Sequence, residues 1–199
     1  WWLPVLFTYK LGDAVGSGMV KPMLVDAGFS LSAIGTLTLS ASLTGMVAAV
    51  VGGLLYDRWG PRTCLLLFGL MQAVGIGGFA LIASGRVDAV TVYGVSLFEQ
   101  TADAMSTVVL FALMMEQCRP NHEGADYSLQ ACLQVIVGGL AGAGSGWLAS
   151  QLGYAGHFAL AGLLGLAVLV PAWLFLWRNP QLAATRPAAH QQSPDGQKD

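Results

Sequence analysis

The chain has 199 residues, of which 55% are hydrophobic and 10% are charged, and its formal net charge is −2. A soluble domain carries about 25% charged residues, so this chain, with a mean hydropathy of +0.62, has too little polar surface to be one. No basic run or aromatic-interleaved patch indicates nucleic-acid binding. Composition therefore predicts an all-α membrane protein, in which each spanning helix needs about 20 apolar residues.

Apolar stretches of this length follow one another along the chain. They lie at 3–20, 34–56, 64–84, 90–115, 127–148 and 157–177. We therefore expect residues 1–178 to form one bundle of six transmembrane helices. Residues 179–199 contain three prolines and almost no large apolar residue, which is typical of a disordered tail.

Basic residues between the stretches indicate the orientation. If the segment 57–63 is cytoplasmic, that side collects six of them: Arg58, Arg62, Arg119, Arg178, Arg186 and Lys198. The opposite side has Lys21 and Arg86, so the positive-inside rule predicts that both ends of the chain are cytoplasmic. The chain begins with Trp1 rather than methionine, and we expect it to be part of a longer protein. A six-helix protein that dimerises is the alternative.

Charged residues fall inside two of the predicted helices. Lys10 and Asp13 lie in the first, and Glu99 and Asp103 in the fourth. A charge at bilayer depth costs about 3 kcal/mol on insertion scales, and such residues usually mark a solute pathway or a proton relay. Each pair shares a helix face by its spacing. We expect Lys10 and Asp13 to form an ion pair, and Glu99 or Asp103 to bind and release a proton. The alternatives are a purely structural pair between Lys10 and Asp13, and a structural tie of Glu99 or Asp103 to Lys10 or to the missing half.

The fifth predicted helix has a polar stripe and a small-residue stripe. The polar stripe, which either contacts solute or bonds a neighbouring helix, consists of Asp126, Gln130 and Gln134. The second stripe repeats every four residues and predicts close helix packing; its members are Gly138, Gly142 and Gly146. Cysteines and histidines are scattered, so we expect no metal site and no cofactor.

The segment between the second and third predicted helices carries a motif. It reads Gly-Leu-Leu-Tyr-Asp-Arg-Trp-Gly-Pro-Arg, and the matching positions are Gly53, Asp57, Arg58, Gly60 and Arg62. It resembles the Gly-x-x-x-Asp-Arg-x-Gly-Arg-Arg signature of the major facilitator superfamily, found between helices two and three of each six-helix half. Pro61 departs from that signature. The resemblance implies one half of a twelve-helix transporter.

A narrower resemblance covers most of the chain. Residues 9–14 resemble the start of the second half of AmpG-type permeases. Glu99 and the segments 105–115, 118–120, 125–130, 145–146 and 152–158 most resemble AmpG-related importers of rhizobactin- and pyochelin-type siderophores. Ala-Asp-Tyr-Ser at 125–128 departs from the Thr-Asp-Tyr-Thr that is usual in that pattern. The resemblance implies a bacterial inner-membrane carrier whose first, second, fourth and fifth helices face a central cavity. Its partners would be a small organic solute, protons, the bilayer and a missing N-terminal half.

Other functions stay open at this point. A muropeptide or acyl-CoA-type permease of the same family is one alternative to the proton-coupled siderophore importer. A non-transporting membrane sensor or scaffold is another, and it predicts that the charges inside the helices are dispensable. A membrane enzyme would need a His/Asp or Lys/His group at one membrane face, and the sequence has none.

Overall fold

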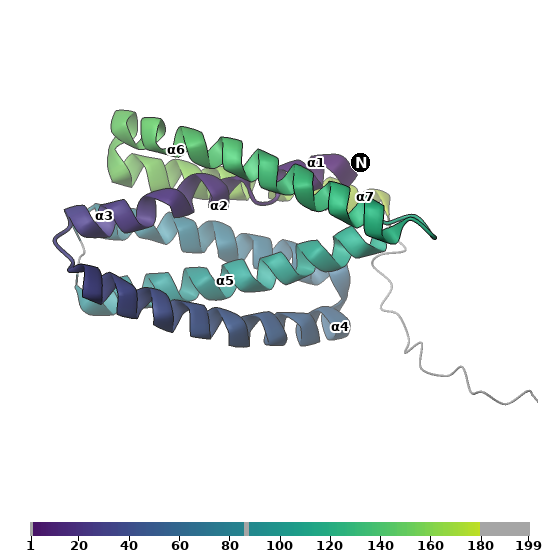
Figure 1. Cartoon of the computed structure of the whole chain (residues 1–199), viewed down its shortest axis with the longest axis horizontal. Coiled ribbons are helices and arrows are strands. Elements are labelled where there is room, and N and C mark those ends of the chain that lie inside the picture. Colours follow the sequence, from purple (N-terminus) through teal and green to yellow (C-terminus); the bar gives the residue numbers. More distant parts are fainter. Residues whose placement is uncertain (1, 86–87, 180–199) are drawn as a thin grey trace, which may run out of the picture.

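The structure is a computed structural model that describes residues 2–85 and 88–179. All regular structure in these residues is helical, as the composition predicts, and the helices lie side by side as a bundle (Figure 1). In chain order the elements are α1 (Trp2–Thr8), α2 (Leu11–Gly16), the 3-10 turn η1 (Ser17–Met19), α3 (Val20–Asp26), α4 (Leu31–Ala83), α5 (Ala89–Glu116), α6 (Glu123–Ala167) and α7 (Leu169–Arg178).

Three helical stretches in the described residues are long and apolar enough to cross a membrane: Leu31–Ala83, Ala89–Glu116 and Glu123–Arg178. The chain thus has the helices of a membrane protein. This count of three stretches does not show the six separate crossings predicted from the sequence. Two of the three stretches, however, contain a reversal of the chain.

α4 folds back on itself at Gly60. The backbone there has φ 77° and ψ 165°, a conformation that is essentially restricted to glycine, and Pro61 then begins the second arm in the position that helices favour for proline. Leu37 and Phe79 belong to one core cluster, although a straight helix would hold them about 63 Å apart. The helix therefore consists of two antiparallel arms, 31–59 and 61–83 (Figure 1). The segment expected between two helices at 57–63 is reduced to a reversal at one residue.

α6 reverses in the same way at Gly153, where φ is 67° and ψ is 169°. The Oγ atom of Ser145 lies 3.3 Å from the Nε2 atom of His157, which places the arms 123–152 and 154–167 side by side. α7 continues the direction of the second arm, and it ends at the same end of the bundle as the N-terminus (Figure 1). The predicted polar segment at 149–156 is thus also reduced to a break at one residue.

The first predicted helix is not continuous, and this corrects the expectation of one uninterrupted helix at 3–20. The chain leaves helical geometry at Tyr9 and Lys10, tightens into η1, and then continues helically through α3 as far as Asp26. Its turn into α4 uses Gly28, whose φ is 88°. The segment left between the predicted helices 3–20 and 34–56 is correspondingly shorter, because α3 occupies its first part.

Large apolar side chains fill the bundle interior and also cover much of its outside. The larger core cluster includes Leu6, Phe68 and Leu113, and its members are almost fully buried. On the first arm of α4 a row of side chains more than half exposed faces outward: Leu39, Leu43, Met46, Val47, Val50 and Leu54. Apolar area this extensive on an outer face requires a lipid or protein environment. Arg86 and, apart from Asn179, the predicted tail at 179–199 lie outside the described residues.

Candidate functional site

Lys10 and Asp103 form a salt bridge in the interior of the bundle. Lys10 lies at the break between α1 and α2, and its side chain is 12% exposed. Asp103 lies 14 residues after the start of α5 at Ala89 and 13 before its end at Glu116, about 20 Å from either end. The lysine Nζ also lies 3.3 Å from the Asp103 carbonyl oxygen. The pair therefore lies near the middle of a helix that is long and apolar enough to cross a membrane.

This pairing differs from the ion pair expected between Lys10 and Asp13 and matches the alternative of a structural tie between Asp103 and Lys10. The spacing of Lys10 and Asp13 predicted an ion pair within one helix. The break at Tyr9 and Lys10 removes that helical register, and the lysine instead reaches across to α5. The Tyr9 hydroxyl donates a 2.8 Å hydrogen bond to the Leu65 carbonyl, which ties the break to the second arm of α4.

Two residues that sequence reasoning did not include complete the polar cluster. Gln72, on the second arm of α4, donates a 3.1 Å hydrogen bond from its Nε2 to the Asp103 carboxylate. The Ser106 hydroxyl donates to the Gln72 Oε1 at 3.0 Å and lies 3.0 Å from the Lys10 Nζ. Both residues are buried. Gln72 is the single strongly polar residue in the apolar stretch 64–84. This isolation is the sequence feature from which its place in the site could have been inferred.

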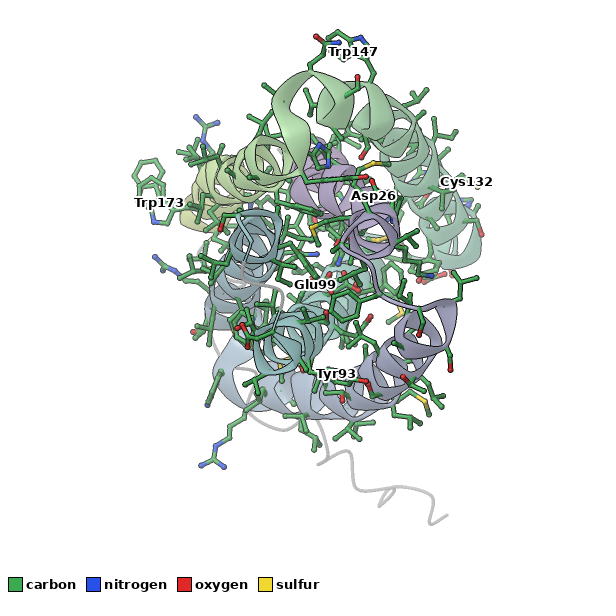
Figure 2. All side chains as sticks on the ribbon, turned by 90° about the vertical axis from the view of Figure 1, so that its left-hand side faces the viewer. Asp26, Tyr93, Glu99, Cys132, Trp147 and Trp173 are labelled. Atoms are coloured by element: carbon green, nitrogen blue, oxygen red, sulfur yellow. The ribbon has the colours of Figure 1, made fainter. Side chains whose placement is uncertain are left out.

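Asp13 and Glu99 lie beside this cluster but outside its salt bridge. Within the described residues neither carboxylate forms a salt bridge. Asp13 interacts electrostatically with Lys10 and Asp103, and Glu99 interacts with all three of these residues. The four charged residues singled out from the sequence are thus brought together. Within the part of the chain that the structure describes, Asp103 forms a salt bridge with its counter-ion, whereas Glu99 forms none. Figure 2 shows Glu99 in the middle of the bundle, with Trp147, Trp173 and Cys132 at its periphery.

A cavity of about 360 Å³ opens on this group. Its polar and charged lining comes from α2, η1, α3, α5 and the first arm of α4: Asp13, Ser17, Lys21, Thr38, Ser96, Glu99, Gln100 and Asp103. The apolar part of the wall includes Leu37 and Phe79. A cavity of this size, with polar groups from several helices converging on it beside apolar side chains, is suited to a small-molecule site.

Glycines allow the elements around the cavity to approach closely. A Cβ on Gly75 would lie 2.9 Å from the Cα of Glu99, and one on Gly12 would lie 2.7 Å from the Ala161 carbonyl oxygen. Real Cβ atoms essentially never come this close, so α5 and α6 lie where they do only because these positions have no side chain. Gly75 thereby sets the position of Glu99.

The polar stripe on α6 lies elsewhere. Asp126 accepts three hydrogen bonds from the backbone N–H and guanidinium of Arg119, at 2.8–2.9 Å, beside the turn between α5 and α6. Gln130 donates to the Met114 carbonyl at 3.1 Å and accepts from the Trp2 indole. The Oε1 atom of Gln134 is buried, and no partner for it occurs in the described part of the chain. None of the three lines the cavity.

The glycine stripe on the first arm of α6 faces α2 and η1. A Cβ on Gly142 would lie 3.4 Å from the Ala14 carbonyl oxygen, and one on Gly138 would lie 3.9 Å from the Ala14 side chain. A Cβ on Gly146 would lie 3.9 Å from Met19. These are ordinary contact distances, so the tightest approaches occur at glycines outside the predicted stripe.

The loop motif lies at the end of the bundle where α4 reverses. Gly60 supplies the reversal itself, and Gly53 faces Val108 of α5. Asp57, Arg58 and Arg62 are exposed around the turn. The motif is therefore distant from the cavity, which lies toward the Gly28 turn at the opposite end of α4.

A buried polar junction links α2 with both arms of α6. The Ser145 hydroxyl donates a 2.7 Å hydrogen bond to the Val15 carbonyl, and the Nε2 atom of His157 lies 3.0 Å from the same oxygen. His157 is fully buried. In the 3-10 geometry of η1 each N–H bonds the carbonyl three residues back rather than four, which turns the Met19 N–H away from Val15. Ser145 and His157 supply donors to the Val15 carbonyl in place of the Met19 N–H.

The family of the chain is evident from comparison with known proteins. Residues 3–195 match the Major Facilitator Superfamily. The chain belongs to this superfamily. The superfamily consists of transporters rather than enzymes, so the expectation that the chain is not an enzyme is confirmed. The superfamily that the loop motif indicated is thus the one to which the chain belongs.

Individual relatives in the superfamily are distant. An uncharacterised protein of Haemophilus influenzae (strain ATCC 51907 / DSM 11121 / KW20 / Rd) is 28% identical over 180 residues, covering 83% of this chain and 42% of that protein. The anhydromuropeptide permease of Escherichia coli strain K12 is 26% identical over 179 residues, covering 88% of this chain and 36% of the permease. The permease of strain O157:H7 gives the same values. The chain thus spans less than half the length of these relatives.

Membership of the superfamily indicates a multi-pass membrane protein, and the chain is homologous to a bacterial inner-membrane permease. The AmpG-type branch named from the sequence agrees with the relatives found, whereas the siderophore importers receive no support from them.

Proposed function

We propose that this chain is one six-helix half of a secondary transporter, and that the solute passes through the cavity lined by Glu99. In this arrangement α1 to α3 cross the membrane once, α4 crosses twice around Gly60, α5 crosses once, and α6 with α7 crosses twice around Gly153. Each arm of α4 is longer than the about 20 residues that a crossing requires. The second half of the transporter would complete the cavity.

The observation that carries this proposal is the difference in surroundings between two carboxylates on neighbouring turns of α5, Asp103 and Glu99. Asp103 is neutralised by Lys10 and held by Gln72. Glu99, one helical turn away, faces the cavity and forms no salt bridge within the described residues. A carboxylate without a counter-ion is expensive in a closed, dry cavity. Proton binding to Glu99 on closure, and release on reopening to water, would couple the solute to the proton gradient.

The break at Tyr9 and Lys10 supports a transport role. Discontinuous helices near the bilayer centre are found where secondary transporters bind solutes and ions, since backbone that is not helical is tolerated only in protein or beside a cavity. Here the break places Lys10 at the cluster, and Asp13, in the next turn, at the cavity wall. A sensor or scaffold has no requirement for this break or for an uncompensated carboxylate.

For the solute we propose a muropeptide-type molecule in place of a siderophore. The support is the name of the relatives in the two strains of Escherichia coli, which are 26% identical to this chain. Nothing in the cavity favours a siderophore, because its lining has no feature specific to a chelated metal. The muropeptide alternative considered from the sequence thus becomes the main proposal.

The transporter would lie in a bacterial inner membrane with both ends of this chain in the cytoplasm. The reversal at Gly60 has exposed Arg58 and Arg62 beside it, and the turn between α5 and α6 has Arg119. Both turns lie at the end of the bundle that the N-terminus occupies (Figure 1). Cysteines placed at 57–63 and 116–126 should react with an impermeant reagent only from the cytoplasm; reaction from outside contradicts this orientation.

The proposed function is tested by uptake of a labelled anhydromuropeptide into vesicles that contain the complete natural protein. We expect uptake that depends on an imposed proton gradient, is abolished by a protonophore, and is reduced by unlabelled anhydromuropeptide but not by a siderophore. Competition by the siderophore alone would restore the first interpretation from the sequence. No uptake of either solute, with correctly inserted protein, would favour the sensor or scaffold.

A further inference from the structure

A second and much smaller cavity lies between α2, the second arms of α4 and α6, and the start of α7. Its volume is about 10 Å³, which is just enough for one water molecule. The polar residues of its lining are Tyr9, Asp13 and Gln72, and the other lining residues are glycines and apolar residues. Asp13 also lines the large cavity. Asp13 is therefore common to both cavities, whereas Glu99 and Asp103 do not line the small one.

Glycines keep the small cavity open. A Cβ on Gly69, which lines it, would lie 3.1 Å from the hydroxyl oxygen of Tyr9 and 2.8 Å from the Cδ2 atom of Leu169. Gly12 and Gly165 also belong to the lining, and a Cβ on either would come within 2.9 Å of a neighbouring helix. An alanine at position 69 would thus fill space beside the Tyr9 hydroxyl.

The side chains of Asp13 and Gln72 interact with each other at this cavity. Gln72 acts on the Asp13 carboxylate, although no hydrogen bond of ordinary length joins the two among the described residues. One N–H of the Gln72 amide goes to Asp103, and its oxygen accepts from Ser106. The second N–H of the amide is therefore the group that can serve Asp13. A polar interaction across a longer gap is where a bridging water is expected.

The Tyr9 hydroxyl is the third polar group of the lining. It donates its hydrogen to the Leu65 carbonyl, and its oxygen can still accept a hydrogen bond. The Asp13 carboxylate forms no salt bridge within the described residues and can accept several hydrogen bonds. The small cavity thus offers one donor and two acceptors, a set that a single water molecule can bond.

We infer that one water molecule occupies the small cavity, where it accepts a hydrogen bond from Gln72 and donates to the Asp13 carboxylate and to the Tyr9 oxygen. About three hydrogen bonds are typical of a buried water. The water hydrates Asp13 and keeps it ionised when the large cavity closes. In the proposed transport cycle, on which this consequence rests, Asp13 has the water and Asp103 has its lysine, so the proton goes to Glu99.

A metal cation fits the small cavity less well than a water. Hard cations take oxygen ligands, whereas Gln72 presents an N–H because its oxygen already accepts from Ser106. The ammonium group of Lys10 also acts on Asp13 and would repel a second cation. Water, which both donates and accepts, matches the lining.

The test is infrared spectroscopy of the complete natural protein, titrated downward from neutral pH. A neutral carboxyl group absorbs separately from a carboxylate, and Asp13→Asn identifies the signal of Asp13. Gly69→Ala places a methyl group beside the Tyr9 hydroxyl and displaces the water. The proton affinity of Asp13 should then rise about tenfold, as for the loss of one hydrogen bond to a charged group. Gly77→Ala, on the same arm of α4 with its Cβ 3.8 Å from the nearest neighbour, should leave the affinity unchanged.

Tyr9→Phe is a second variant that keeps the ring and removes one partner of the water. It should raise the proton affinity of Asp13 by less than Gly69→Ala does, because two partners of the water remain. If Gly69→Ala does not fold, Tyr9→Phe decides alone. An Asp13 signal that titrates as in the wild type in every folded variant of the two overturns the inference, and a wild-type signal that depends on sodium concentration would assign the small cavity to a cation.

Uptake assays on the same wild-type preparation separate this inference from the proposed function. Proton-dependent uptake of anhydromuropeptide together with unchanged titration in the variants would overturn the water site and leave the transport function standing. The expected titrations without any uptake would support the water site and contradict the transport function.

Discussion

Lys10, at the gap between α1 and α2, forms a salt bridge with Asp103 at the middle of α5, while Glu99 one turn earlier has no such partner within the described residues. The two carboxylates look equivalent in the sequence, but their surroundings differ. Asp103 is bonded by a lysine and by Gln72, so its charge is permanently balanced. Glu99 is left to face the cavity, and of these two carboxylates it is the one suited to change its charge in the proposed transport cycle.

The first prediction concerns the salt bridge. Lys10→Ala should lower the stability of the complete protein by about 3–5 kcal/mol, because it leaves the Asp103 carboxylate buried without a counter-ion. The double variant Lys10→Ala/Asp103→Asn removes both charges and should recover most of that loss. The measurement is the apparent melting temperature in detergent, with Arg119→Ala at the exposed Arg119–Asp126 pair as a control that changes little. A double variant as unstable as the single one would contradict the structural role of the pair.

The second prediction concerns the reversal of α4. Gly60→Ala should destabilise the protein by about 1–3 kcal/mol, since an alanine is strained in that backbone conformation. A Cβ at this position meets no atom within 4 Å, so the cost is one of backbone alone. Gly94→Ala is the matched control, because Gly94 is helical and a Cβ there also meets nothing. Equal melting temperatures for the two variants would show that α4 does not reverse at Gly60.

The third prediction concerns the contact between the second arm of α4 and α5. Gly75→Ala places a Cβ 2.9 Å from the Cα of Glu99 and must push the two helices apart, at a cost of about 1–3 kcal/mol. Because the displaced residue is Glu99, uptake should fall more than stability alone explains. Gly35→Ala, a helical position with open space around it, should affect neither. Normal uptake by Gly75→Ala would mean that the position of Glu99 is not critical.

Much of the fold is predictable from the sequence, whereas its breaks are less so. Apolar length predicts the helices, and the glycine in the loop motif marks the reversal at Gly60. The break at Tyr9 and Lys10 has no such signal, because it depends on bonds to distant residues, such as that from Tyr9 to the Leu65 carbonyl.

The charged residues of the site are also predictable, because a charge inside an apolar stretch is costly and usually marks a functional site. Which of these residues pair with each other is harder to predict, since the pairing depends on which helices are in contact. Gly75 lies on a predicted outer helix, and nothing in its local sequence shows that it faces Glu99. The stripe on α6 illustrates the reverse case, because Asp126 and Gln130 have a regular spacing but bond to neighbouring residues away from the cavity.

The fourth prediction concerns the junction at Val15. Ser145→Ala or His157→Phe should each cost about 1 kcal/mol, because each removes one donor from the Val15 carbonyl. The double variant should cost more than the sum of the two single ones, since only then is the carbonyl left with neither side-chain donor. Melting temperatures of the four proteins form a double-mutant cycle. Strict additivity would show that the two side chains do not act on the same carbonyl.

The most direct test of the proposed mechanism is the movement of protons with the solute. Proteoliposomes that contain the complete protein and a trapped pH indicator are given an inward gradient of anhydromuropeptide, without any proton gradient. Wild-type protein should acidify the lumen as solute enters, whereas Glu99→Gln should still admit solute down its gradient but leave the internal pH constant. Acidification by Glu99→Gln at the wild-type rate would contradict the assignment of the proton to this carboxylate.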